Sequence, residues 1–137
     1  MKKLIITLVI AGIAALGFSV KANAQEFHVK KLVCVQPEGY VFPDAIYFRY
    51  RINSGSTKRY PGSSDLSFTR GAERSDFCYF SVNRDDTIHI ELWDNDTFDD
   101  DDFLGSFEVK VDWQKEETVT LRQSNGTAVY RLTYVIE

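Results

Sequence analysis

The sequence has few of the residues that most enzymes and metal-stabilised folds use. Its 137 residues include only two cysteines and two histidines. No Cys-x-x-Cys pair occurs, so nothing in the sequence points to a structural zinc site. No Ser, Cys or Lys motif places a nucleophile beside His28 or His89, and His89 lies in a pattern typical of a partly exposed strand residue. We therefore expect a protein that is not an enzyme.

Basic residues are also in the minority, with 16 Lys and Arg against 20 Asp and Glu and a formal net charge of −4. Binding to nucleic acid needs clustered Lys and Arg, so we expect no nucleic-acid partner. The length allows one domain, and a hydrophobic content of 44% is enough to form a core. We expect this domain to be a monomer.

The N-terminal segment is typical of a secretory signal peptide. Two lysines precede an almost wholly apolar run over residues 4–20, and a small-x-small cleavage site follows at residues 22–24. The run is slightly short for a membrane-spanning helix, which favours cleavage over anchoring. We expect residues 1–24 to be removed and residues 25–137 to form a secreted or periplasmic domain. Cleavage would remove three lysines and no acid, which changes the net charge from −4 to −7.

Export would place Cys34 and Cys78 in an oxidising compartment. An even pair of cysteines there predicts one disulfide. The alternative is two buried free thiols, because Cys78 occupies a register that faces the apolar side of its strand.

Apolar and polar residues alternate with a period of two through much of the chain, and no segment has a useful helical period. The alternation predicts strands at residues 45–52, 66–69, 78–82, 87–93, 107–111, 119–121 and 128–136. Turn signals separate these strands, and Asn125-Gly126 predicts a hairpin. Seven or eight short strands predict an all-β fold, an antiparallel Greek-key β-sandwich.

A cluster of aspartates joins two of these strands. Six of the nine residues from 94 to 102 are acidic, namely Asp94, Asp96, Asp99, Asp100, Asp101 and Asp102. Their mutual repulsion indicates a disordered segment, a cation site or a surface charge fence. Carboxylates at positions n, n+2 and n+8 can return to one centre, and hard oxygen donors suit Ca²⁺. An EF-hand loop is excluded, because Phe98, Asp99 and Gly105 stand where it needs an oxygen ligand, a glycine and a glutamate.

This segment resembles the third calcium loop of the C2 domain family, in which Asp-x-Asp is followed by a further Asp six residues on, two apolar residues and Gly. Asp94, Asp96 and residues 102–105 match that pattern in order and spacing. The family's first calcium loop has two acidic ligands six residues apart, and Glu38 and Asp44 have that separation. The Asp-Asp-Asp-Asp-Phe-Leu-Gly segment is also similar to the C2 domain of perforin-type proteins.

The resemblance implies a Ca²⁺-binding module that docks on a phospholipid surface. The implied metal ligands are Glu38, Asp44, Asp94, Asp96, Asp99 and Asp102. Family members dock through apolar loop tips, which implies membrane contacts by Tyr40, Val41, Phe42 and Phe98. For Phe98 the alternative is a side chain that folds back over its own loop.

Arg49 and Arg51 share the outward face of the strand at residues 45–52. In the family a basic sheet face can bind inositol lipids or other anions, and the alternative is an ordinary solvated face. Three functions remain open for the whole chain. It is a calcium-dependent lipid-docking module, a calcium-stapled module that binds a protein or glycan, or a metal-free sandwich whose aspartates supply solubility.

Overall fold

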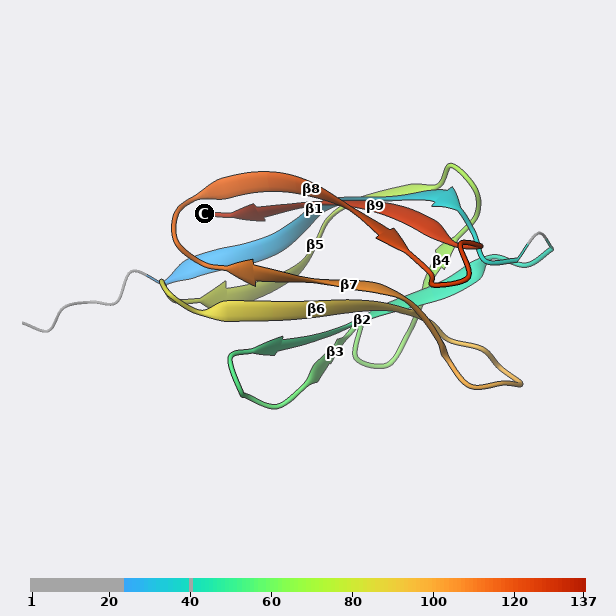
Figure 1. Cartoon of the computed structure of the whole chain (residues 1–137), viewed down its shortest axis with the longest axis horizontal. Coiled ribbons are helices and arrows are strands. Elements are labelled where there is room, and N and C mark those ends of the chain that lie inside the picture. The colour runs from blue at the N-terminus through green and yellow to red at the C-terminus, as the bar shows by residue number, and fades with distance from the viewer. Residues whose placement is uncertain (1–23, 40) are drawn as a thin grey trace, which may run out of the picture.

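Two antiparallel sheets pack face to face in the computed structural model, which describes residues 24–39 and 41–137 (Figure 1). Their strands are β1 (Gln25–Gln36), β2 (Asp44–Ile52), β3 (Lys58–Tyr60), β4 (Leu66–Phe68), β5 (Glu73–Val82), β6 (Thr87–Asp94), β7 (Asp102–Lys110), β8 (Lys115–Arg122) and β9 (Val129–Ile136). One sheet has the order β5-β1-β9-β8 and the other β3-β2-β6-β7, with β4 also paired to β2. The predicted all-β sandwich is confirmed.

The described residues contain no helix, and so no helix long and apolar enough to cross a membrane. The predicted hairpin is also present, since β8 and β9 pair around a turn in which Gly126 has a φ of 77°. Alternation failed to predict β1 and β3. In β1 the buried positions change from Phe27 and Val29 to Leu32 and Cys34, because a register shift against β9 lies between Val29 and Lys31. β3 has only three residues.

The core lies between the two sheets and is rich in aromatic rings. Phe27 of β1 and Phe107 of β7 both stack on Tyr134 of β9, with ring centroids 5.4 and 5.5 Å away. Tyr50 of β2 stacks on Phe80 of β5 at 4.2 Å. The Phe107–Tyr134 and Tyr50–Phe80 pairs join one sheet to the other. Each large apolar side chain that is fully buried stabilises the fold by roughly 1.5–3 kcal/mol.

The two cysteines do not form a disulfide, so that prediction is wrong. Cys34 and Cys78 are buried free thiols. Cys34 lies near the end of β1, whereas Cys78 lies in β5 next to the part of β1 around His28. Six residues of extended strand separate these places, about 20 Å, and a disulfide needs Cα atoms within about 7 Å of each other. The count of cysteines suggested a pair, but the strand arrangement separates them.

The loops after β1 and β6 emerge at the same end of the sandwich, on the right in Figure 1. Asp94 at the end of β6 pairs with Asp102 at the start of β7. Gly105 sets the path of β7 here, because its φ of 138° is unfavourable for other residues and an added Cβ would lie 3.2 Å from the Leu121 Cβ. The backbone conformation and close packing of β7 at this point therefore explain the glycine that ends the aspartate motif.

Candidate metal centre

The β1–β2 and β6–β7 loops bring six carboxylates to one cleft, which we call the carboxylate cup. Its acidic lining residues are Glu38, Asp44, Asp94, Asp96, Asp99 and Asp102, the same six that the sequence predicted as ligands. Oxygens of Glu38, Asp96 and Asp102 lie within 4.8 Å of one another. Two oxygens bound to one Ca²⁺ at 2.3–2.6 Å can be up to about 5 Å apart. These three side chains therefore fit a single calcium ion.

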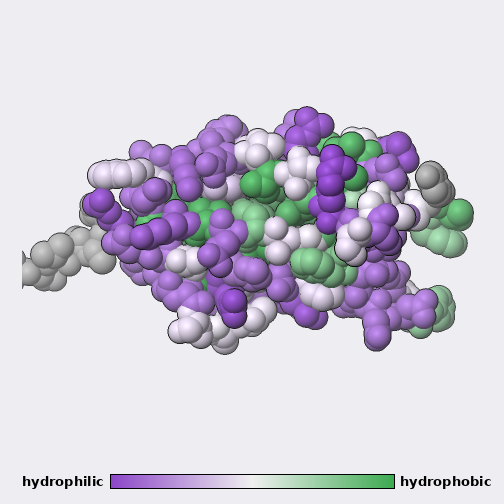
Figure 2. Space-filling model, in the orientation of Figure 1, coloured by the Kyte–Doolittle hydropathy of each residue, from purple (hydrophilic) through white to green (hydrophobic). Residues whose placement is uncertain are grey.

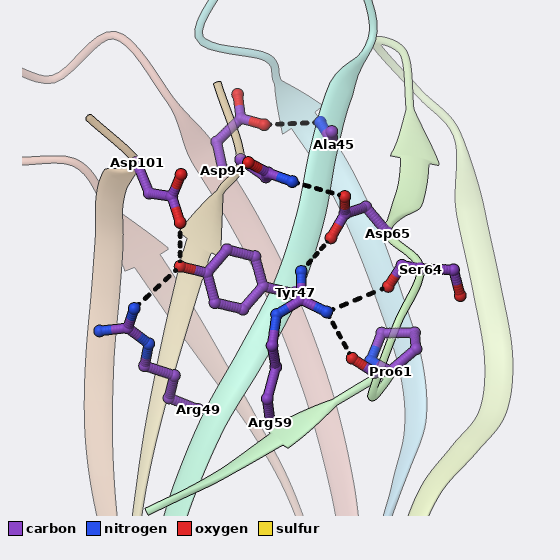
Figure 3. Close-up of polar contacts among 10 residues, drawn as sticks. Ala45, Tyr47, Arg49, Arg59, Pro61, Ser64, Asp65, Asp94 and Asp101 are labelled. Carbon is purple, nitrogen blue, oxygen red and sulfur yellow. Dashed lines mark hydrogen bonds and ion pairs between the residues drawn. The ribbon is translucent and has the colours of Figure 1, made fainter. Parts of the chain in front are cut away.

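Asp44 and Asp94 form the floor of the cup and are only 3% and 6% exposed. Both oxygens of Asp44 accept a hydrogen bond from the Glu38 backbone N–H, at 3.2 and 3.1 Å. The buried hydroxyl of Tyr130 also donates to Asp44 Oδ2. Asp94 Oδ1 accepts from the Ala45 N–H at 2.5 Å, as Figure 3 shows, which leaves its second oxygen for a cation. Backbone and side-chain donors thus fix both carboxylates.

Glu38 has one side-chain oxygen that no hydrogen bond from the described residues satisfies. Its Oε1 accepts a hydrogen bond from Gln123 Nε2 at 2.6 Å, but its Oε2 is buried without any hydrogen bond among the described residues. A buried carboxylate oxygen without a donor is costly, and a bound cation would satisfy it. The sequence did not predict Gln123 or Tyr130 here. Only Tyr130 carried a signal, because it is an inward-facing strand residue whose hydroxyl needs a partner.

The electrostatics of the cup favour a positive ligand. Burial, assisted by the charges of Asp44, Asp96 and Glu38, raises the pKa of Asp94 to about 7. Burial also raises the pKa of Glu38, Asp44 and Asp96, and the neighbouring Asp102 adds to the effect at Glu38 and Asp96. No lysine or arginine is among the described residues that line the cleft. Two buried carboxylates and three half-buried ones therefore lie together without a compensating cation among the described lining residues.

Not every aspartate of the cluster faces the cup. Asp101 Oδ2 instead accepts a hydrogen bond from the Tyr47 hydroxyl at 2.5 Å, on the outer face of the sheet (Figure 3). Asn95 donates to Asp65 Oδ2 at 2.7 Å. Asp100 is exposed and does not line the cup. The loop is thus fastened to the sheet on one side while it presents carboxylates on the other.

The outward face of β2 differs from the ordinary solvated face that was the alternative to anion binding. Arg49 and Arg59 lie against the ring of Tyr47, with guanidinium carbons 5.6 and 4.1 Å from its centroid. Arg49 also lies 4.5 Å from the Trp93 ring centroid. We call Tyr47, Arg49, Arg59 and Trp93 the cation–aromatic layer. Because the arginines cover it, Tyr47 is only 1% exposed although it points outward.

The two arginines predicted to bind anions have different surroundings. Arg49 belongs to the cation–aromatic layer, whereas Arg51 is exposed. Both line a shallow cleft that also contains His89 and Glu91. Anion binding at this cleft stays a prediction.

Exposed apolar side chains project beside the cup. Phe98 is 94% exposed, and Val41 and Phe42 are 81% and 80% exposed. Figure 2 shows hydrophobic groups at both protruding loop tips at this end. Phe98 therefore does not fold back over its loop. Tyr40, the fourth residue predicted to contact a membrane, lies outside the described residues.

Comparison with known proteins finds a matching family for part of the chain. A sequence model of the C2 domain family matches residues 75–126, which include the whole β6–β7 loop and its aspartates. This segment is therefore similar to the C2 domain family. No curated protein matches the sequence.

Solved structures show the same fold. The first C2 domain of plant extended synaptotagmin 1 superposes with a TM-score of 0.54 at 12% identity, over 85% of this chain and 95% of that one. The calcium-bound tandem C2 domains, A and B, of extended synaptotagmin 2 match with a TM-score of 0.54 at 18% identity, over 85% of this chain and 45% of that one.

Human GIVD cytosolic phospholipase A2 gives a TM-score of 0.51 at 9% identity, and the match covers 83% of this chain and 17% of that chain. C2 domains are commonly calcium- and phospholipid-binding modules that are not themselves catalytic, and this match shows the same fold within an enzyme. In this chain the carboxylate cup lies on the two loops where the family resemblance implied calcium ligands.

Proposed function

We propose that residues 25–137 form an exported module that docks on anionic phospholipid surfaces when Ca²⁺ fills the carboxylate cup. The observation that carries this proposal is the position of the cup. Six carboxylates, with no lysine or arginine among the described residues that line their cleft, lie beside loop tips that expose Val41, Phe42 and Phe98. A folded domain rarely combines exposed aromatic tips with uncompensated buried charge unless a ligand and a surface use them.

The residues of the cup and the tips have separate parts in docking. Without a cation the six carboxylates repel anionic headgroups. Bound Ca²⁺ would neutralise part of this charge and offer coordination positions to phosphate oxygens of the lipid. Phe98, Val41 and Phe42 then enter the interface, where each large apolar side chain contributes roughly 1.5–3 kcal/mol if it is fully buried. The donors to Asp44 and Asp94 hold the floor of the cup ready for the cation.

The proposed export means that a weak affinity for Ca²⁺ is sufficient. The expected cleavage site lies directly before β1, which begins at Gln25, so cleavage there would leave every described strand intact. Calcium is abundant outside cells, and extracellular sites have Kd values of about 10⁻⁴–10⁻³ M. N-terminal mass spectrometry of the protein recovered after export tests this part, because it should find a chain that begins at Gln25.

Sedimentation with vesicles tests the docking. The purified protein should pellet with phosphatidylcholine vesicles that contain phosphatidylserine when Ca²⁺ is present, and should stay in solution with a chelator. Phe98→Ser should lower pelleting at least fivefold and leave the calcium affinity unchanged. The matched control is Trp113→Ser, because Trp113 is 66% exposed but lies in the β7–β8 loop at the other end of the sandwich.

Calcium binding without vesicle binding would contradict the lipid proposal. In that case the cup would serve to staple two loops together, and the module would bind a protein or glycan outside the cell. Absence of calcium binding at millimolar concentrations would contradict both and leave the metal-free sandwich.

A further inference from the structure

A second group of candidate metal ligands lies at the end of the sandwich remote from the cup. Glu26 and His28 lie two residues apart on β1, and Glu137 directly follows β9. Glu26 and Glu137 are cross-strand neighbours, since each backbone N–H donates to the other residue's carbonyl, at 2.7 and 3.0 Å. In Figure 1 the start of β1 and the end of β9 lie at the left, opposite the calcium loops. This cluster therefore shares no residue with the cup.

His28 is the unexpected member of the cluster. Its side chain is nine-tenths buried, with its ring stacked on Tyr79 at 4.9 Å between centroids. Its Nδ1 is buried and has no hydrogen-bond partner among the described residues. The nearest carboxylate oxygen, Glu137 Oε1, is 3.9 Å away, which is too far for a hydrogen bond. A buried ring nitrogen without a partner needs an explanation, and a ligand between it and the glutamates would supply one.

Neither glutamate forms an ion pair with a lysine or arginine of the described chain. Like charges placed directly opposite each other on paired strands destabilise a sheet. Lys30, the next outward residue of β1, forms its ion pair with Glu116 at 2.6 Å instead. Across the described chain, no lysine or arginine forms an ion pair with Glu26 or Glu137. Within the described residues, the site thus combines a buried imidazole nitrogen that has no hydrogen-bond partner with two carboxylates that have no Lys or Arg ion-pair partner.

The donor atoms select the kind of ion. One ligand atom from each of Glu26, His28 and Glu137 lies within 4.8 Å of the other two. An imidazole nitrogen favours Zn²⁺ and similar transition-metal ions, whereas Ca²⁺ takes oxygen ligands alone. Zn²⁺ binds nitrogen and oxygen at about 2.0–2.2 Å, so two of its ligands are at most about 4.4 Å apart. Glu26 and Glu137 are exposed, so their side chains have room to turn toward an ion.

We propose that Glu26, His28 and Glu137 form a second divalent-metal site, which takes Zn²⁺ or a related transition-metal ion and leaves one coordination position to water. This site does not depend on the proposed calcium function, because the two donor sets lie at opposite ends and differ in chemistry. An ion held there would fasten the first residues of β1 to the end of β9.

Calorimetric titration of the purified protein with ZnCl₂, in a buffer that contains saturating Ca²⁺, tests this proposal. We expect one bound Zn²⁺ and a raised melting temperature. Glu137→Gln should weaken Zn²⁺ binding at least tenfold without affecting the fold, since its side chain is 60% exposed. His28→Gln should weaken it further. His89→Gln is the matched control, because His89 is the only other histidine and lies on β6 beside Glu91 at 3.3 Å.

Co²⁺ as a substitute gives an independent readout. Its visible absorption should change on binding to the wild-type protein and to His89→Gln, whereas Glu137→Gln should need at least ten times more Co²⁺ for the same change. The proposal is overturned if Glu137→Gln and His28→Gln bind Zn²⁺ as tightly as the wild type. It is also overturned if Asp96→Asn, rather than these variants, abolishes Zn²⁺ binding, because the ion then occupies the cup.

Discussion

The carboxylate cup and the cation–aromatic layer occupy adjoining parts of the β2–β6 strand pair, but they treat charge in opposite ways. In the layer each guanidinium lies against a ring, and Arg59 also forms an ion pair with Asp65. In the cup, burial raises the pKa of several carboxylates, and no cation among the described residues answers them. Charge that the fold satisfies itself is structural, whereas charge that it leaves unsatisfied indicates a ligand.

The largest effect should come from removing the charge of the cup. Asp94→Asn combined with Asp96→Asn keeps the shape of both side chains but removes two carboxylates from the proposed calcium ligands. At a Ca²⁺ concentration of about 100 times Kd, binding stabilises a protein by about 2.7 kcal/mol. We expect the double variant to lose this stabilisation, measured as the calcium-induced rise in melting temperature, and to be at least as stable as the wild type without calcium.

The control for this variant is Asp100→Asn, which removes one negative charge, half as many as the double variant, from the same loop at a residue outside the cup. It should keep the full calcium response. An equal loss of the calcium response in both variants would mean that all the acidic residues of the loop attract calcium without a defined site. The cup would then not differ from an ordinary charged surface.

The donors beneath the cup should have the next largest effect. Tyr130→Phe removes the buried hydroxyl that donates to Asp44, and the loss of a partner for a buried polar group costs about 1–3 kcal/mol. Urea denaturation should show this loss, and it should persist in saturating calcium. The control is Tyr134→Phe, whose hydroxyl donates to the exposed Glu117 and should contribute less than about 1 kcal/mol. Similar losses in both variants would contradict a special role for the floor of the cup.

The pH dependence of calcium binding should follow Asp94. Calcium must displace the proton from this carboxyl, whose pKa is raised to about 7, so the affinity should fall roughly tenfold between pH 8 and pH 6. The raised pKa also means that the folded calcium-free protein binds this proton more tightly than the unfolded chain. Asp94 alone therefore lowers stability as the pH rises from about 4 to about 7. Calcium titrations at several pH values check the first point, and a constant affinity would contradict it.

The smallest effect should come from the cation–aromatic layer. Tyr47→Phe keeps the ring beneath the two arginines and removes the hydroxyl that binds Asp101. We expect a loss of about 1 kcal/mol in stability and a change of less than twofold in calcium affinity. A calcium affinity that falls as far as in the double aspartate variant would show that the anchor at Asp101 controls the cup.

The sequence predicted what depends on local pattern. Strict alternation located β2 and β6, and the Asp94, Asp96 and Asp102 spacing located three cup residues that the fold brings to one cleft. Other features depend on contacts between distant segments. Gln123 reaches Glu38 from the β8–β9 turn, and Asp101 turns toward Tyr47, and no spacing rule encodes either contact.

Two errors have the same origin. The number of cysteines suggested a disulfide. Strand pairing instead places Cys78 of β5 beside the first residues of β1, far from Cys34 near the end of β1. The twelve-residue strand β1 was not predicted, because the register shift after Val29 reverses which side chains face the core and so interrupts the alternation. Pairing with a neighbouring strand sets both features, and a single strand's own sequence does not show them.

The buried thiols make the loop tips convenient to label. A thiol reacts as its thiolate, and burial raises the pKa of Cys34 and raises that of Cys78 to about 12, so both should resist alkylating reagents in the folded protein. A single exposed cysteine introduced by Phe98→Cys would therefore accept a fluorophore without removal of the native cysteines. The emission wavelength of such a fluorophore would show whether the tip leaves water and enters a bilayer.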